Sequence, residues 1–253
     1  MAYSYERIGE ITKNLSAVKK ILEKPTNRHT EYAAGIASKA AYEEKDYALA
    51  IKYYEKLENN ASYPGNKLKA IIGLMRSYTF QEEFGVAELY ANRVLTDPLS
   101  LDNVKLEAHY VKGKAGLKAN RFEDALIEFR EVSSQTSGVI GAEAQYSIAL
   151  IYHLQEEFKK SEDEVRILMK EKAGYDFWVA KALILQAKNS IGLDDYVQAE
   201  YTINSVLKGY AIEGDGIIEE ANEVMDVILA YKNQDKEIEE KGDDTIEIGD
   251  GND

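Results

Sequence analysis

The sequence has no cysteine among its 253 residues, so it cannot form a disulfide, a thiolate nucleophile or a cysteine-ligated zinc site. Proline occurs only three times, and no apolar run approaches the roughly 18 consecutive residues that span a bilayer. The first twenty residues also lack the apolar core of a secretory signal. The compartment stays open: the chain is cytoplasmic as it stands, and periplasmic or envelope-associated if it is a fragment without its signal.

Basic residues are also few. The chain has 31 Lys and Arg against 45 Asp and Glu, which gives a formal net charge of −14. Nucleic acids and anionic membranes are themselves polyanions, so this balance disfavours both as partners. Hydrophobic residues make up 45% of the chain, enough to bury a core. The composition therefore points to a folded protein and makes a nucleic acid or an anionic membrane a poor candidate for its partner.

Motifs that carry chemistry are absent as well. The sequence has no phosphate-binding glycine loop, no HExxH and no GxSxG, and its three histidines lie far apart in the chain. We therefore expect no catalytic residue, no cofactor and no metal site.

What the sequence does have is an internal repeat. An aromatic residue is followed three positions later by a small residue, and then by apolar residues four and seven positions further on. The small residues are Ala50, Ala87, Ala125, Ser161 and Ala199, separated by 37, 38, 36 and 38 positions. A small residue and the positions four and seven after it lie on one face of an α-helix. The phrase therefore predicts a recurring amphipathic helix, with a weaker copy upstream at Ala17.

A second helix is predicted before each of these phrases, joined to it by a short polar turn. This helix is recognised by a position twelve residues before the small residue of the phrase, and four of its five copies hold a small residue there. These positions are Ser38, Met75, Gly113, Ala149 and Ala187. Each unit thus reads as helix, tight turn, helix.

These units resemble the tetratricopeptide repeat, a helical hairpin with a period of 34 residues. The resemblance covers residues 31–207, and the longer periods of this chain imply longer loops between repeats. It implies an all-α, right-handed superhelical solenoid of helix hairpins with a C-terminal capping helix. We expect a partial or degenerate repeat at 1–30, five repeats at 31–215, a capping helix at 216–235 and an acidic flexible tail at 236–253.

The resemblance also implies where a partner binds, because the first helix of each hairpin lines the concave side in this family. One residue after the first-helix small position, four of five repeats carry a cation in an otherwise acidic chain: Lys39, Arg76, Lys114 and Lys188. Tyr42, Tyr110, Tyr146 and His153 occupy neighbouring positions on the same predicted face. Cations beside rings suit a peptide with carboxylates. The asparagines with which some relatives complete a carboxylate clamp are not found here.

The alternative interpretation is that these cations are ordinary surface residues, paired with nearby acids such as Glu43, Glu107 and Glu143. Phe177 and Trp178 open another first helix, where packing against the fourth repeat is favoured over an interface role.

The leading hypothesis is a non-enzymatic scaffold that binds a peptide or partner protein on the concave face. The alternative is an architectural segment of a longer repeat array, which mediates assembly of an envelope complex or associates with itself. The long repeats and acidic, cysteine-free composition are similar to envelope-associated bacterial repeat proteins. The sequence does not predict an oligomeric state.

Overall fold

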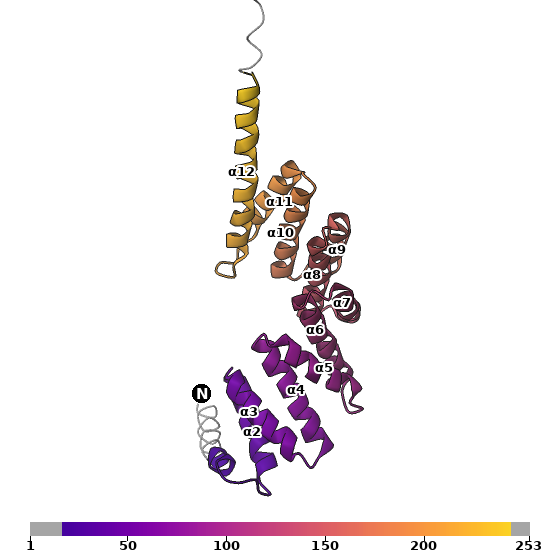
Figure 1. Cartoon of the computed structure of the whole chain (residues 1–253), viewed down its shortest axis with the longest axis vertical. Coiled ribbons are helices and arrows are strands. Elements are labelled where there is room, and N and C mark those ends of the chain that lie inside the picture. The colour runs from indigo at the N-terminus through magenta and orange to yellow at the C-terminus, as the bar shows by residue number, and fades with distance from the viewer. Residues whose placement is uncertain (1–16, 244–253) are drawn as a thin grey trace, which may run out of the picture. The chain divides into compact units, whose positions relative to one another are not determined.

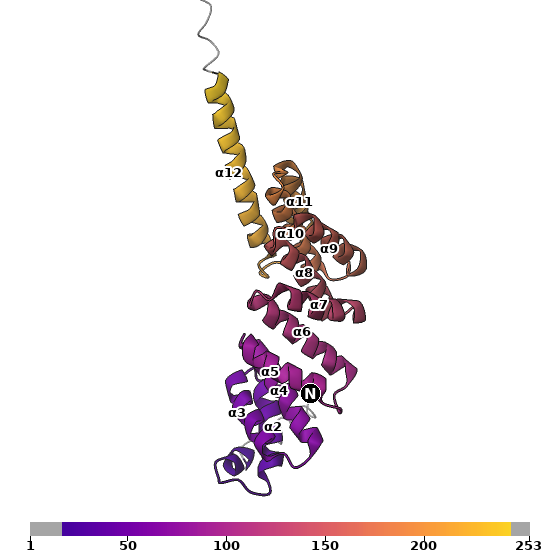
Figure 2. The ribbon, with the colours of Figure 1, turned by 45° about the vertical axis from the view of Figure 1, so that its right-hand side comes forward.

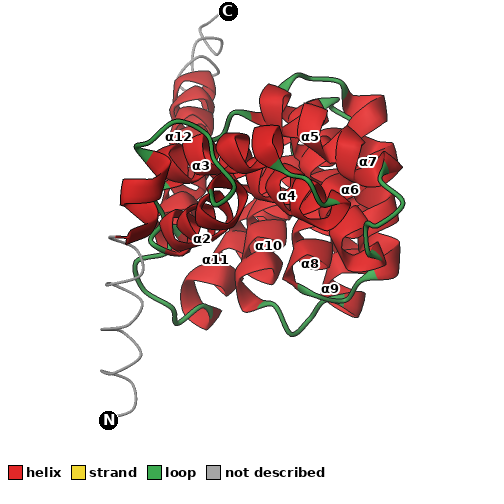
Figure 3. Cartoon of the chain, turned by 90° about the horizontal axis from the view of Figure 1, so that it is seen from below, coloured by secondary structure: helices red, strands yellow, loops and turns green. Residues whose placement is uncertain are grey.

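The computed structural model describes residues 17–243, and the side chains of residues 17–233. The described part consists of helices joined by loops, as Figure 3 shows. The chain divides into two compact units, Met1–Gln135 and Thr136–Asp253.

Consecutive helices pair into hairpins, which can be followed by colour in Figures 1 and 2. The first unit holds three: α2 (Thr30–Glu43) with α3 (Tyr47–Asn60), α4 (Pro64–Phe80) with α5 (Phe84–Thr96), and α6 (Asp102–Lys118) with α7 (Phe122–Gln135). The second unit holds α8 (Val139–Leu154) with α9 (Phe158–Glu171), α10 (Asp176–Gly192) with α11 (Tyr196–Gly209), and the single helix α12 (Ile217–Asp243). The predicted all-helical hairpin fold is confirmed.

The repeated small residue lies at the centre of each hairpin. Ala50, Ala87, Ala125, Ser161 and Ala199 are all completely buried, and the apolar positions four and seven residues later are buried too. In the third repeat the contact is especially close, because a Cβ added at Gly116 on α6 would lie 3.1 Å from the Cβ of Ala125 on α7. The small side chain is therefore what allows the two helices to pack together.

The turn inside each hairpin has one conformation throughout. Five non-glycine residues have φ between 55° and 61°, the left-handed region, and each lies five positions before the buried small residue: Lys45, Glu82, Asn120, Glu156 and Asp194. In the first hairpin the N–H of Asp46 donates to the carbonyl of Ala41 at 2.9 Å, a bond that closes the helix end in a Schellman motif. The turn sequences differ, but this backbone geometry recurs.

The helix α12 caps the last hairpin. Ile217, Ala221, Val224 and Ile228 are buried against α10 and α11, whereas Leu229 is 45% exposed. Glu219, Glu223 and Asp226 lie exposed on other faces of the helix. The exposed side of α12 thus combines acidic side chains with the apolar Val227 and Leu229.

Both ends of the chain differ from the expected boundaries. The helix α12 continues to Asp243, beyond the expected end at 235, and residues 244–253 of the predicted acidic tail lie outside the described residues. At the other end, residues 17–22 are helical, with Val18 and Leu22 buried and Ala17 exposed. Ala17 is therefore not the buried small residue of an upstream copy, and residues 1–16 of that predicted partial repeat are outside the described range.

The buried contact at Ala125 gives a direct test of the repeat register. The change Ala125→Leu adds three carbons where α6 and α7 already touch, so it should lower the free energy of unfolding by about 1–3 kcal/mol. Denaturant unfolding followed by circular dichroism measures this. The same substitution at the exposed Ala230 of α12 is the control. Equal unfolding midpoints for the two variants would contradict the assigned packing.

Candidate functional site

In each unit the first helices of the hairpins form a continuous side. The backbone of α4 contacts those of α2 and α6, and α10 contacts α8 and α12. Within the described residues of each unit, the backbones of the second helices do not contact one another, although the side chain of Arg93 on α5 pairs with that of Glu58 on α3. The first helices of a unit therefore lie side by side. We call their solvent-facing side the inner face of that unit. The predicted binding residues belong to first helices, five in the first unit and three in the second.

The three predicted cations of the first unit have different surroundings. Lys39 is 64% exposed and lies 3.6 Å from Glu43, one turn along its own helix. Arg76 instead reaches the next repeat, where its Nε and Nη2 donate to the two carboxylate oxygens of Glu107 at 2.7 and 2.6 Å. The hydrogen bond from Arg76 to Glu107 raises the pKa of the guanidinium. Arg76 therefore links two repeats, as the surface-residue interpretation of these cations anticipated.

Aromatic rings surround the remaining cation and extend the same face. The Lys114 ammonium lies 5.5 Å from the ring centre of Tyr110 and 5.7 Å from that of Phe84, within the range of cation–π attraction. Tyr42 lies edge-on to Tyr47 and Phe80, which stack on each other at 4.7 Å. The spacing of the repeats predicts a place on this face for Tyr42 but not its cluster with Tyr47 and Phe80, although all three residues lie at or near helix ends.

In the second unit, Tyr146 packs against Trp178, with ring centres 5.5 Å apart. Burial raises the pKa of the Tyr146 hydroxyl, with a smaller contribution from the charge of Glu220. The expectation that Trp178 packs against the fourth repeat is thereby confirmed, since Tyr146 belongs to α8.

The imidazole of His153 is held in one tautomer by a chain of hydrogen bonds. Ser161 Oγ donates to the carbonyl of Ala149 at 2.8 Å, so it can only accept from the Asn189 amide nitrogen, also at 2.8 Å. The amide oxygen of the buried Asn189 then faces His153 Nδ1 at 2.7 Å and must accept from it. The proton of a neutral His153 is thus fixed on Nδ1, which leaves Nε2 as a hydrogen-bond acceptor.

The last predicted cation, Lys188, forms an ion pair that the sequence analysis missed. The Nζ atoms of Lys188 and Lys181 donate to the two carboxylate oxygens of Glu220 on α12, each at 2.6 Å. Burial works to raise the pKa of Glu220, but the hydrogen bonds and charges of the two lysines outweigh it, and the pKa is lowered. The sequence contains a signal for this ion pair, because Glu220 follows Lys188 by 32 positions, much as Glu107 follows its partner Arg76 by 31 positions.

Beside this ion pair an open groove of about 330 Å³ runs between α10 and α12. It is lined by Lys188, Ile191, Glu223, Val224 and Val227. Val227 is 53% exposed, so the groove offers apolar surface next to paired charges. Such a lining suits contact with another polypeptide.

Among the described residues, no group of three or more histidine or acidic side chains is placed to hold a metal ion. Of the two histidines on first helices, His109 faces Glu128 and His153 faces Asn189. None of the described helices is long and apolar enough to cross a bilayer.

The sequence matches no protein-family model and no curated protein. In contrast, the structure is similar to solved helical-repeat proteins. MamA from Desulfovibrio magneticus RS-1 has a TM-score of 0.58 at 16% identity, over 71% of this chain and 94% of that one. YrrB, described as a tetratricopeptide-repeat protein with an unusual peptide-binding site, has a TM-score of 0.57 at 12% identity, over 82% and 98%. TTC0263 from Thermus thermophilus has a TM-score of 0.51 at 14% identity, over 77% and 98%.

These similarities show that the chain has the tetratricopeptide-repeat fold. Proteins of this fold generally serve as scaffolds for protein–protein interaction.

The two lysines of α10 that pair with Glu220 are expected to hold the capping helix α12 in place. The change Glu220→Gln should lower the free energy of unfolding by about 1–2 kcal/mol at pH 7, because it removes the charge that two ammonium groups share. Since folding lowers the pKa of Glu220, its contribution is present at neutral pH and is lost as the pH falls through the folded-state value, below 4.5. Unfolding measured between pH 7 and about pH 3 should therefore show the two proteins converging on acidification.

Glu219 is the matched control, since it is an exposed acid in the same first turn of α12. The change Glu219→Gln removes the same charge and should change stability by less than half as much. If both variants unfold alike at pH 7, the bridge between α10 and α12 does not stabilise the cap.

Proposed function

We propose that the chain is a non-enzymatic scaffold that binds a peptide or partner protein on the inner faces of its two units. The observation that carries this proposal is the groove between α10 and α12, where exposed apolar side chains adjoin the Lys188–Glu220 pair on a rigid helical surface. The fold supports the proposal because it generally serves this role. The peptide-binding site of YrrB provides a precedent for this fold.

On the first unit the proposed contact residues are Lys39, Tyr42, Arg76, Tyr110 and Lys114. Lys39 is the most exposed of the three cations and offers its charge to a partner carboxylate, whereas Arg76 is already oriented by Glu107. The tyrosines supply contact area with few rotatable bonds, so they lose little entropy on binding. We therefore expect a partner with acidic groups beside apolar ones.

On the second unit the proposed contact residues are Tyr146, His153 and Lys188. Because His153 Nδ1 donates to Asn189, the Nε2 atom is the one that accepts a hydrogen bond from a partner N–H or O–H group. Lys188 is held in place by Glu220 beside the groove.

The architectural alternative has no single observation of comparable weight. A repeat stacked on the exposed side of α12 would bury the acids Glu219, Glu223 and Asp226 together with the exposed apolar Val227 and Leu229.

The test is affinity capture from native extract, with the captured proteins identified by mass spectrometry. The inner-face variant carries Lys39→Glu and Lys114→Glu, which avoid the ion pairs of Arg76 and Lys188 that join helices, and Val227→Ser, which removes an exposed apolar side chain from the groove. The control variant carries Lys52→Glu and Lys170→Glu on the second helices α3 and α9, with the same change in net charge. Circular dichroism checks that all three proteins are equally folded.

A partner that binds the inner face should be retained by the wild type and the control, and reduced at least about fivefold by the inner-face variant. Equal capture by all three proteins would place binding elsewhere and reject the residues proposed for the first unit. Equal loss in both variants would mean that net charge alone governs capture, which also contradicts the proposal.

A further inference from the structure

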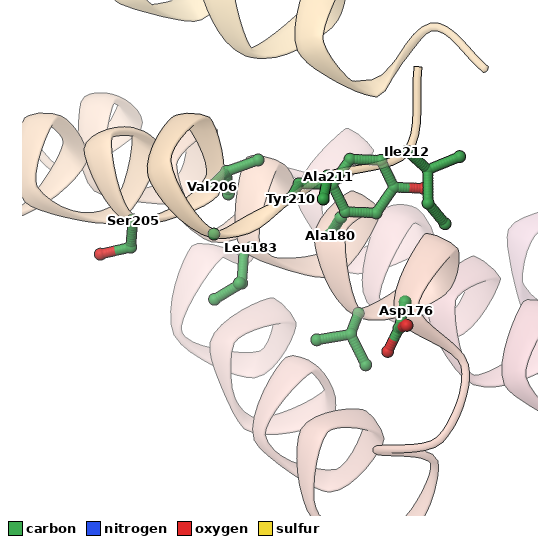
Figure 4. Close-up of a pocket in the computed structure, with 10 residues that line it drawn as sticks. Asp176, Ala180, Leu183, Ser205, Val206, Tyr210, Ala211 and Ile212 are labelled. Carbon is green, nitrogen blue, oxygen red and sulfur yellow. The ribbon is translucent and has the colours of Figure 1, made fainter. Parts of the chain in front are cut away.

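A second cavity in the second unit lies away from the positions of the inner face. It has a volume of about 340 Å³ and opens between the start of α10, the end of α11 and the loop that follows (Figure 4). Its apolar wall is formed by Val179, Ala180, Leu183, Val206, Tyr210 and Ile212. Ile212 is 50% exposed at the rim. This size is at the lower end of the range for small-ligand pockets and exceeds what one side chain needs.

The preceding repeat shows why the cavity exists. The period between the fourth and fifth repeats is 38 residues, so Tyr210 occupies the position that Lys172 holds in the fourth repeat. Lys172 is buried, and its Nζ donates to the carbonyl of Thr136 at 2.9 Å. The Thr136 carbonyl in turn lies against the start of α8, where a Cβ added at Gly141 would come within 2.1 Å of it. In the fourth repeat, a lysine side chain and a neighbouring carbonyl therefore pack at the site.

In the fifth repeat these two elements are replaced. Gly174 stands where the fourth repeat has Thr136, and a Cβ added there would meet nothing within 4 Å. The hydroxyl of Tyr210 donates to Asp215 in the loop before α12. The loop itself spans 210–216 and contains Gly214 and Gly216 with positive φ. The equivalent site is consequently left open.

The rim of the cavity is negatively charged. Asp176, in the first turn of α10, lines the cavity and is exposed, and among the described residues no hydrogen bond or ion pair neutralises it. Figure 4 shows Asp176 at the end of the cavity where Ile212 lies. Burial, the hydrogen bond to Asp215 and the charges of Asp215 and Asp176 together raise the pKa of Tyr210 to about 12. The cavity thus combines apolar walls with a carboxylate at its opening.

We propose that this cavity binds a lysine side chain of a partner polypeptide. The four methylene groups of lysine pack along Val179, Leu183 and Val206, and the ammonium group pairs with the Asp176 carboxylate at the opening. The fourth repeat provides the template within the same chain, because the lysine side chain of Lys172 is buried at the equivalent place there, with its ammonium group bound to the Thr136 carbonyl instead of a carboxylate. An acidic side chain would meet the charge of Asp176, and a purely apolar one would leave it unpaired.

The test uses Nα-acetyl-lysine N-methylamide as the probe and the full chain labelled with ¹⁵N. We expect saturable shifts of the backbone amide signals of Leu183, Val206 and Gly209, with millimolar affinity. Nα-acetyl-norleucine N-methylamide has the same stem without the ammonium group, and Nα-acetyl-glutamate N-methylamide reverses the charge. Norleucine should bind about three- to fivefold more weakly than lysine, and glutamate should give no saturable shift.

Two variants test whether the Asp176 carboxylate supplies the charge that binds lysine. The change Asp176→Asn should bring lysine down to the affinity of norleucine, while Asp226→Asn removes an exposed acid from α12 and should leave lysine binding unchanged. The amide spectra themselves show whether each variant is folded. The proposal is overturned if lysine gives no saturable shift at these residues, if norleucine binds as tightly as lysine, or if Asp176→Asn and Asp226→Asn bind lysine equally. These results are independent of binding on the inner faces.

Discussion

Close contact at one small residue per hairpin is the constraint on which the rest of the structure depends. Where Ala125 meets Gly116 there is no room for a larger side chain, and the equivalents of Ala125 in the other repeats are completely buried. Burying one side of each first helix this tightly leaves the other side facing solvent, at a spacing fixed by the neighbouring first helices. The inner faces are therefore a consequence of the core, and their side chains are free to vary without cost to packing.

That freedom is only partial, because some inner-face charges also hold repeats together. Arg76 binds Glu107 in the next repeat, and Lys188 binds Glu220 in the capping helix. The carboxylate in such an ion pair offsets much of the positive charge that the cation presents to a partner, but it also holds the cation in one position. Lys39, which lies beside Glu43 on its own helix, keeps more freedom and more exposure. The inner face thus contains both structural and available cations, which the regular spacing of the sequence does not distinguish.

The sequence predicts the fold well because the period is carried by buried residues. Regular spacing of Ala50, Ala87 and their equivalents predicts the helix pairs, and the capping helix predicted at 216–235 is found at Ile217–Asp243. The surroundings of single side chains could not be predicted in the same way. Whether Lys188 is free depends on Glu220, 32 positions away, and the tautomer of His153 depends on Asn189 and Ser161 in two other helices.

Departures from the repeat are more informative about function than the repeat itself. The same position holds Lys172 in the fourth hairpin and Tyr210 in the fifth, and the exchange converts an occupied site into an open cavity with Asp176 at its rim. A helical repeat makes this comparison possible within one chain, since neighbouring units present the same backbone with different side chains. A site that the protein's own side chain fills in one repeat can be filled by a side chain of a partner in the next repeat. Comparing neighbouring repeats thus identifies both a site and the kind of group that fits it.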